Sequence, residues 1–342
     1  MPACALHINA VRLLNVLRMA LLMLACALLV LPAAAAAGVP VSANRLQRVA
    51  PGVYVLAGAA EAPNAANQGR VGNLGVLVGP RGVLVIDTGS SRARAEELLA
   101  AVRRITPLPV VAAVISHPAQ EFLFGNAAFT DRHIPVYSAA ATPRLMAQRC
   151  EHCLSTLTGL LGAARMQGTR LDLPQPLPPL PVAGDWSPGG RSVQIIEGPQ
   201  GSVPGNLMIR DRRTGVVFSG ALLSVGRVPA VQDTRPLAWR SALSALAQPS
   251  VAVVVPAYGA VVWRHPAAGQ ADLAGALDAL GDYLQQLDEI TDRAYQAGTP
   301  LADLAAVTAL PAYADWAEYQ PNHSLNVFYR YLQHEADDLA AH

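Results

Sequence analysis

The sequence contains no lysine. All 25 of its basic residues are arginine, against 24 acidic residues, for a formal net charge of +1 over 342 residues. Lysine chemistry, such as a Schiff base or a phosphate-binding loop lysine, is therefore excluded. This balance of charge gives no concentrated positive face for phosphates, so we expect no nucleic-acid partner. Charged residues make up only 14% of the chain and hydrophobic residues 52%, which excludes a disordered protein and predicts one large or two modest globular domains.

Acidic residues are absent from the first 18 positions, which carry Arg12 and Arg18 ahead of an apolar run over residues 19–31. Pro32 and a row of small residues ending near Ala37 follow. This order predicts a cleaved secretory signal peptide over residues 1–37. A membrane anchor is the alternative, but the apolar run is shorter than the roughly 20 residues that a spanning helix needs. We therefore expect a periplasmic or secreted protein without a membrane span after cleavage.

Short apolar runs alternate with helical spacing along the rest of the chain. Strands are predicted near residues 52–58, 73–79, 81–89, 109–116, 192–197, 206–210, 216–220 and 251–256, and helices near 94–104, 142–166, 236–247, 273–297 and 322–339. Residues 171–190 are too rich in proline for a helix or a central strand and predict a surface connection between two halves. Two successive β-then-α halves predict a layered α/β (α+β) domain with helices outside the sheets.

Four segments in order resemble the metallo-β-lactamase fold. A turn at Asp87 precedes a strand that ends at His117, and residues 117–126 align with the family's His-x-His-x-Asp-His-x-x-Gly-Asn motif, of which Gly125 and Asn126 keep the end. Three later segments, 201–206, 218–222 and 255–259, follow with the family's spacing. The resemblance implies a four-layer αβ/βα sandwich over residues 38–310, with a C-terminal helical extension over 311–342 packed on the same domain.

The resemblance also implies two zinc ions that activate a bound water, but the ligand positions have largely lost their donor atoms. His117 keeps an imidazole, and Glu121 stands in place of the aspartate. The other positions hold Ala119, Phe122, Ser202, Ala221 and Tyr258. One imidazole and one carboxylate are fewer than the three protein ligands of a typical catalytic zinc site. We therefore expect neither zinc nor another cofactor, with Phe122 and Tyr258 filling the vacated space.

Three further stretches, residues 65–79, 150–153 and 310–332, are similar to exported metallo-β-lactamase-fold proteins associated with quinoprotein (PQQ-dependent) oxidation and sulfur oxidation. What this similarity implies is a role in periplasmic oxidation. The expected partner is a small molecule or a periplasmic protein, such as a quinoprotein dehydrogenase or a cytochrome.

Cys150 and Cys153 form a CxxC motif that an oxidising compartment would favour as a structural disulfide. A redox role needs the motif at a helix N-terminus, whereas the predicted helix begins at Thr142. A metal site made by the two cysteines with a distant histidine is a third alternative.

Four other polar residues are candidates by position. His265 follows Tyr258 by seven residues and either faces the cleft or lies in a surface loop. His323 and Asn326 stand one helical turn apart and either line the pocket or pack at a helix start. Asp87 is expected to fix its loop by hydrogen bonds.

The leading hypothesis is an exported protein that kept the fold and the cleft, lost zinc-dependent hydrolysis, and binds a ligand or a partner. The first alternative is an active hydrolase with a rebuilt site, using His117 and Glu121 as an acid–base pair or a single metal completed by His265. The second is a redox or scaffold protein that acts through Cys150 and Cys153.

Overall fold

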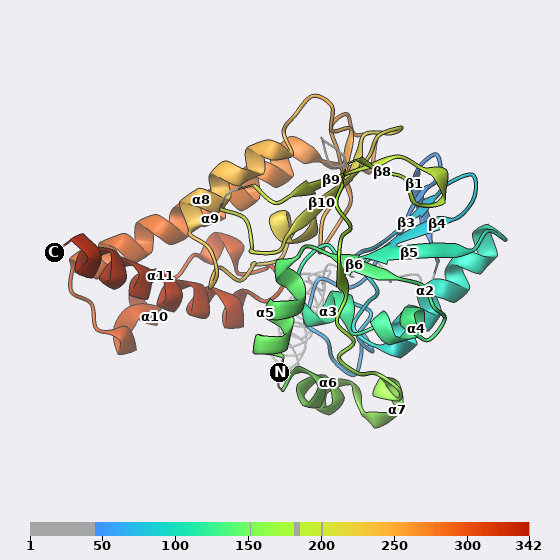
Figure 1. Ribbon diagram of the computed structural model, residues 1–342. Coiled ribbons are helices and arrows are strands. Elements are labelled where there is room, and N and C mark those ends of the chain that lie inside the picture. Colours follow the sequence, from blue (N-terminus) through green and yellow to red (C-terminus); the bar gives the residue numbers. More distant parts are fainter. Residues whose placement is uncertain (1–44, 151, 181–184, 200, 342) are drawn as a thin grey trace, which may run out of the picture. The chain divides into compact units, whose positions relative to one another are not determined.

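Two seven-stranded sheets pack against each other, with helices on their outer faces (Figure 1). The computed structural model describes residues 45–341 apart from 151, 181–184 and 200, so the predicted signal peptide lies outside the described residues. This arrangement confirms the predicted αβ/βα layering with a helical region at the C-terminus.

The first sheet has its strands in chain order. They are β1 (Gln47–Ala50), β2 (Val53–Leu56), β3 (Leu74–Val78), β4 (Val83–Ile86), β5 (Val110–Val114), β6 (Val136–Ser138) and β7 (Gln175–Pro176). Strands β1 to β4 are antiparallel, and β4 to β7 are parallel. The parallel part places the carboxyl ends of β4 and β5 side by side.

The second sheet runs in the reverse order, from β14 to β8. Its strands are β8 (Asp185–Trp186), β9 (Val193–Glu197), β10 (Leu207–Asp211), β11 (Val216–Phe218), β12 (Val253–Val255), β13 (Val262–Trp263) and β14 (Ala271–Asp272). Strands β11 and β12 are parallel neighbours, as β4 and β5 are in the first sheet. The predicted Pro-rich connection supplies β7 and β8, which are the outermost strands of the two sheets.

Alternating side chains along each strand explain the layers. In β4, Leu84 and Ile86 point into the core between the two sheets, whereas Val83 and Val85 point toward the helices that cover the first sheet. Successive side chains of a strand face opposite sides of the sheet, so an apolar run buried on both faces builds two cores at once. The predicted strands over 73–79, 81–89 and 109–116 are confirmed because each is such a run.

The helices over the first sheet pack through one apolar face each. They are α2 (Arg92–Ile105), α3 (Gln120–Leu123), α4 (Asn126–Thr130), α5 (Ala141–Arg149), α6 (Cys153–Leu161) and α7 (Ala163–Met166). Leu98, Leu99 and Val102 of α2 are buried against the sheet, as their spacing predicted. Ser91 begins α2 by accepting a hydrogen bond from the backbone N–H of Arg94, at 3.1 Å.

The remaining helices belong to the second half of the chain. They are α8 (Pro236–Ala242), α9 (Leu273–Gln296), α10 (Leu304–Val307) and α11 (Tyr319–Ala341), with short 3₁₀ turns η1 (Pro188–Gly190), η2 (Gly220–Leu222), η3 (Leu243–Ala245), η4 (Leu301–Asp303) and η5 (Pro311–Tyr313). The leucine spacing from residue 273 correctly predicted α9, whose Leu280, Leu284 and Leu287 are fully buried. None of the helices between residues 45 and 341 has both the length and the apolar character needed to cross a bilayer.

The prediction of one helix over residues 142–166 is wrong, because the structure divides this stretch into α5, α6 and α7. Helix α5 begins at Ala141, so Thr142 is not its N-cap; the Thr142 hydroxyl instead donates to the Gly205 carbonyl oxygen, at 3.4 Å. The backbone leaves the helical conformation at Cys150, and Gly162, with φ of +83°, separates α6 from α7. Cys153 consequently becomes the first residue of α6.

Candidate functional site

A cavity of about 420 Å³ lies beyond the carboxyl ends of the central parallel strands. His117 follows β5, Ala221 lies in η2 after β11, and Tyr258 follows β12, and all three line the cavity. Glu121 reaches it from α3. The predicted motif positions 117, 119, 121, 221 and 258 thus meet at one place, because the crossover connections bring these strand ends together.

Asp87, Ser116 and His117 form a hydrogen-bonded chain beside the cavity. The Asp87 carboxyl accepts hydrogen bonds from the Ser116 backbone N–H and hydroxyl, both at 2.7 Å. The Ser116 hydroxyl oxygen lies 2.8 Å from His117 Nδ1. The Asp87 backbone has φ of +63°, an uncommon conformation for a residue with a side chain. The predicted role of Asp87 in fixing its loop agrees with these bonds, which tie the end of β4 to the end of β5.

Burial shifts both titratable groups of this chain toward their neutral forms. It raises the pKa of Asp87 to about 7, although the hydrogen bonds from Ser116 act in the opposite direction. It lowers the pKa of His117 to about 3. The imidazole is therefore neutral at pH 7, and the Asp87 carboxyl is close to half ionised.

The Phe122 ring lies beside the cavity and packs between the rings of His117 and Tyr258. Its ring centroid lies 4.4 Å from that of His117 and 5.3 Å from that of Tyr258, and its side chain is fully buried. Gly72 allows this packing because it has φ of +64° and no side chain, and a Cβ atom there would overlap the Phe122 ring. Apolar contacts have thus taken the position of one zinc ligand in the resembling motif.

Replacing Gly72 with alanine should lower the free energy of unfolding by about 2 kcal/mol or more, since the new methyl group displaces Phe122 and the left-handed backbone disfavours a side chain. Gly298→Ala is the matched control, because Gly298 has φ of +65° with open space around it and should lose only about 1 kcal/mol. Urea denaturation measures both values. Equal losses in the two variants would show that Phe122 packing does not depend on Gly72.

The side chain of Arg227 lines the cavity from the loop after β11. The Arg227 guanidinium lies 4.1 Å from the centroid of the Tyr258 ring and donates to the Ala60 carbonyl oxygen. Burial raises the pKa of Glu121, an effect that the positive charge of Arg227 opposes. Burial also raises the pKa of the Tyr258 hydroxyl, so this residue is uncharged. Arg227 contributes a positive charge to this wall, in addition to the ion pair of Arg149 and Asp233.

Two candidate cleft residues, Ser202 and His265, lie outside the main cavity. Ser202 lines a separate cavity beside Gly198 and Asn206, and its neighbour Val203 lines the main cavity instead. His265 is exposed in the loop after β13, outside the main cavity. Both residues lie in loops, and the pattern of predicted strands does not determine where those loops run.

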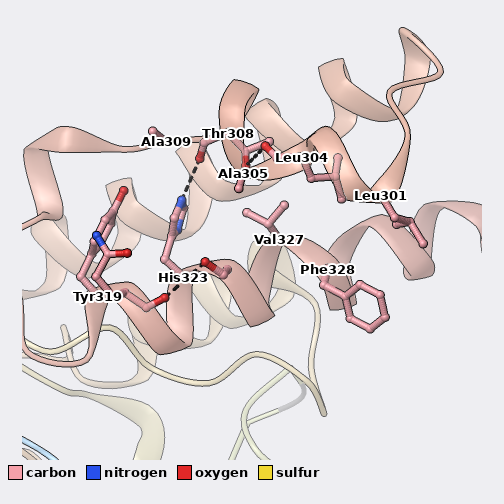
Figure 2. Close-up of a pocket in the computed structure, with 11 residues that line it drawn as sticks. Leu301, Leu304, Ala305, Thr308, Ala309, Tyr319, His323, Val327 and Phe328 are labelled. Carbon is pink, nitrogen blue, oxygen red and sulfur yellow. Dashed lines mark hydrogen bonds between the residues drawn. The ribbon is translucent and has the colours of Figure 1, made fainter.

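His323 and Asn326 lie in the helical region at the C-terminus. His323 lines a cavity of about 290 Å³ between α10 and α11 (Figure 2), where its Nε2 lies 2.7 Å from the Thr308 carbonyl oxygen. Asn326 donates to the Pro229 carbonyl oxygen and the Tyr283 hydroxyl, at 2.7 and 2.9 Å. The alternative interpretation, packing within the helical region, therefore describes both residues.

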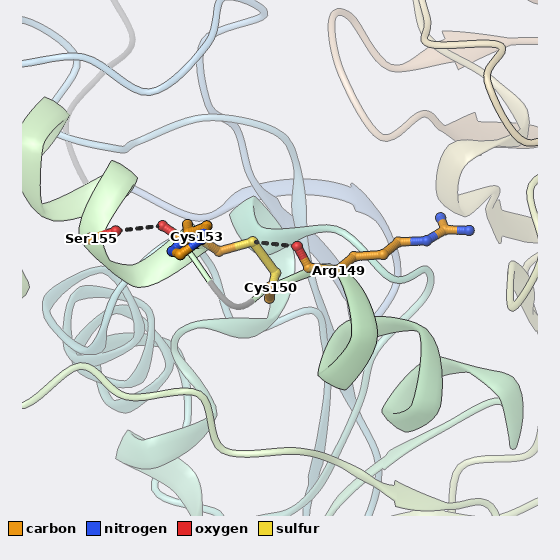
Figure 3. Close-up of a disulfide and its surroundings, with 5 residues drawn as sticks. Arg149, Cys150, Cys153 and Ser155 are labelled. Carbon is orange, nitrogen blue, oxygen red and sulfur yellow. Dashed lines mark hydrogen bonds between the residues drawn. A yellow bond between two sulfur atoms is a disulfide. The ribbon is translucent and has the colours of Figure 1, made fainter.

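The cysteine pair lines the main cavity at the break between α5 and α6 (Figure 3). Cys150 and Cys153 are joined by a disulfide. Cys150 is 6% exposed and contacts the core of the first sheet, whereas Cys153 is half-buried. A disulfide that closes so short a loop stabilises the fold by about 2 kcal/mol in the loop-entropy account, less than one that closes a long loop.

The cavity wall also contains polar residues that the sequence did not indicate, among them Arg149, Arg227, Asn322, Ser224, Gln232 and Asp233. Arg149 forms an ion pair with Asp233, at 2.6 Å, and Asn322 donates to the Val228 carbonyl oxygen, at 2.7 Å. No motif marks these positions. The one available signal was that arginine carries all the basic charge in a chain with few charged residues.

Residues 67–258 of this chain match a family model described as "Metallo-beta-lactamase superfamily". The chain belongs to that superfamily. The match spans more than half of the 342 residues and includes both pairs of central parallel strands. Comparison with curated proteins gives no match.

Solved structures of the superfamily have the same fold at low sequence identity. A metallo-beta-lactamase from Pontibacter korlensis is 19% identical, with a TM-score of 0.53 over 70% of this chain and 98% of its own. A metallo-beta-lactamase from Pseudomonas aeruginosa, in its mono-zinc form, is 17% identical with a TM-score of 0.50, over 70% and 94%. A stereoselective inverting sec-alkylsulfatase from Pseudomonas sp. is 16% identical with a TM-score of 0.61, over 84% of this chain and 50% of its own.

The donor set of the superfamily's zinc site does not fit the side chains that surround this cavity. Ala119, Phe122 and Ala221 carry no ligand atom, so the motif positions that line the cavity offer only the side chains of His117, Glu121 and Tyr258 as donors. Among the residues that the structure describes, no three His, Cys, Asp or Glu side chains come together as a metal site. We therefore derive no chemistry through a metal ion here.

Proposed function

We propose that this member of the metallo-beta-lactamase superfamily is an exported binding protein, which holds a small organic anion in the main cavity without zinc and without hydrolysing it. The packing of Phe122 between His117 and Tyr258 carries this proposal, because it fills ligand positions with rings and leaves an open cavity beside them. A cavity of this volume suits a ligand of small-molecule size.

The charge of the wall supports an anionic ligand. Arg227 contributes a guanidinium that is held in place by the Tyr258 ring and the Ala60 carbonyl. Burial favours the neutral forms of His117 and Glu121, which reduces the negative charge that an anion would meet. Met146, Val203 and Trp239 provide apolar surface for the remainder of the ligand. An anionic head on a short alkyl chain therefore matches the lining.

Isothermal titration calorimetry with hexanoate and hexyl sulfate tests this proposal, with 1-hexanol and hexylamine as neutral and cationic probes of similar size. We expect the two anions to bind and Arg227→Gln to weaken their binding about tenfold or more, because a hydrogen bond to a charged group contributes about 1.5–3 kcal/mol. Tyr258→Phe, which keeps the ring under Arg227, is the matched control and should change the affinity little.

Three results would contradict the proposal. Equal binding of hexylamine and hexanoate would remove the role of Arg227. About one zinc ion per chain in metal analysis, lost in His117→Ala, would show that the metal site persists. Turnover of hexyl sulfate or of an ester that His117→Asn abolishes would favour the alternative of a rebuilt hydrolase.

The similarity to exported proteins of quinoprotein-linked oxidation supports a place for this binding role in periplasmic oxidation. In this proposal the partner is a quinoprotein dehydrogenase or a cytochrome. Surface plasmon resonance between the purified chain and the quinoprotein dehydrogenases of its source organism measures the interaction, and absence of binding to all of them would remove the proposed partner.

A further inference from the structure

The disulfide in the wall of the main cavity stands where a soluble thiol can reach it. We propose that Cys150 and Cys153 are a reversible thiol–disulfide exchange site, at which a small organic thiol carrying a carboxylate enters the cavity and attacks Cys153. The two cysteines lie at the junction of α5 and α6 (Figure 3), and both line the main cavity.

The two sulfur atoms differ in access. Cys150 is 6% exposed and contacts the core, whereas Cys153 is half-buried and its side chain borders the cavity. Attack on a disulfide proceeds at the more accessible sulfur, and the other sulfur departs. Cys153 is therefore the sulfur that forms the mixed disulfide, and Cys150 is the leaving group.

The start of α6 places Cys153 at the positive end of a helix. Cys153 is the first residue of this nine-residue helix, and the preceding residue, His152, makes no side-chain hydrogen bond to the first turn. The positive end of a helix lowers the pKa of a cysteine thiol placed there. The sequence had predicted Cys153 in the middle of a helix, so this arrangement follows only from the break that the structure shows at Cys150.

The cavity also suggests the kind of thiol. Its volume of about 420 Å³ admits a small organic molecule, and Arg227 lines it together with both cysteines, whereas the Arg149 guanidinium is already bonded to Asp233. A guanidinium binds a carboxylate through paired hydrogen bonds. A thiol that carries a carboxylate can thus be held by its charge while its sulfur approaches Cys153.

The exchange is balanced with the thiol as the reductant. A thiolate attacks Cys153 Sγ, the S–S bond breaks, and Cys150 departs as a thiolate that takes up one proton. A second thiolate attacks the small-molecule sulfur of the mixed disulfide, which releases the oxidised organic disulfide and leaves Cys153 as a thiolate that takes up a proton. Two thiols are oxidised and the protein disulfide gains two electrons. A small organic disulfide restores the oxidised pair by the reverse steps.

Glutathione is the probe for the experiment. The chain, purified after export to an oxidising compartment, is equilibrated at pH 7 with graded ratios of reduced to oxidised glutathione, quenched with acid, alkylated and analysed by peptide mass spectrometry. We expect the folded pair to change reversibly between disulfide and dithiol across these ratios. A pair that stays oxidised at every ratio, and opens only in denaturant, is a structural disulfide and overturns the proposal.

Paired serine variants test the direction of attack. Oxidised glutathione should form an adduct on Cys153 in Cys150→Ser at least tenfold faster than on Cys150 in Cys153→Ser, while circular dichroism verifies that both variants are folded. Equal rates, or faster reaction at Cys150, would overturn the assignment. The calorimetry measures anion binding without any exchange step, so failure of the exchange at the disulfide would leave the proposed binding function standing.

Discussion

Replacing Asp87 with asparagine should make the free energy of unfolding rise with pH relative to the unaltered chain, by about 1.4 kcal/mol per pH unit between pH 4 and pH 7. Burial raises the pKa of this carboxyl from 3.8 to about 7. The folded chain therefore holds a proton that the unfolded chain releases in this range, and Asp87 loses its stabilising effect as pH rises. Asparagine, which does not titrate, removes that loss, worth about 4 kcal/mol over the range.

The variant His117→Asn should show the opposite slope. Burial lowers the pKa of this imidazole from 6.5 to about 3, so the unfolded chain binds the extra proton between these values. His117 contributes stability that is present above pH 6.5 and is lost as pH falls toward 3. Relative to the unaltered chain, the free energy of unfolding of His117→Asn should thus fall by about 1.4 kcal/mol for each unit of increasing pH in that range.

Urea denaturation at half-unit steps from pH 4 to pH 8 measures both slopes. Subtraction of the curve for the unaltered chain removes the contributions of groups that the variants leave in place, Glu121 among them. Asparagine at either position can keep a hydrogen bond to Ser116, which makes both variants suitable. Difference curves that are flat for both variants would show that Asp87 and His117 titrate alike in the folded and unfolded chains.

The second large effect concerns the ion pair of Arg191 and Asp211. Replacing Arg191 with methionine should lower the free energy of unfolding by about 3–5 kcal/mol, because it leaves a fully buried carboxylate without its partner. The two side chains are bonded at 2.8 Å, and Arg191 also donates to the carbonyl oxygens of Val78 and Pro51, each at 2.9 Å. Burial alone would raise the pKa of Asp211, but hydrogen bonds, chiefly from Arg191, lower it below its usual value.

An exposed pair serves as the control for this variant. Arg235 and Asp337 are about half exposed, so Arg235→Met should cost less than about 1 kcal/mol. The double variant Arg191→Met with Asp211→Leu should recover part of the loss, because no charge then remains buried. Thermal denaturation followed by circular dichroism gives the comparison. A loss at Arg191 no larger than that at Arg235 would mean that the buried ion pair and the bonds from Arg191 to Val78 and Pro51 stabilise the fold no more than an exposed pair does.

Periodic apolar segments made much of the fold predictable. The strands β3, β4 and β5 are apolar on both faces, and α9 has leucines at helical spacing, so packing and local preference agree. Strands β6, β13 and β14 have only two or three residues each and left no such pattern. The break at Cys150 was missed because the apolar spacing continues on both sides of it.

The site was partly predictable for a related reason. His117, Glu121 and Tyr258 follow motif segments whose places at strand ends are determined by the topology. Arg227 reaches the same cavity through its stacking on Tyr258 and through a loop paired with Ala317, contacts that join residues far apart in the sequence. Such tertiary contacts have no local signature, which is also why the sequence left both a cleft position and a surface-loop position open for His265.

Both halves of the chain contribute residues to the main cavity. The chain segment before β8 supplies His117 and Glu121, the segment after it supplies Arg227 and Tyr258, and the two segments build one sheet each. Neither half encloses the cavity, which exists only where the two sheets have docked. The cavity therefore forms only when the two halves of the chain dock. A ligand bound in it would contact both halves and stabilise their association.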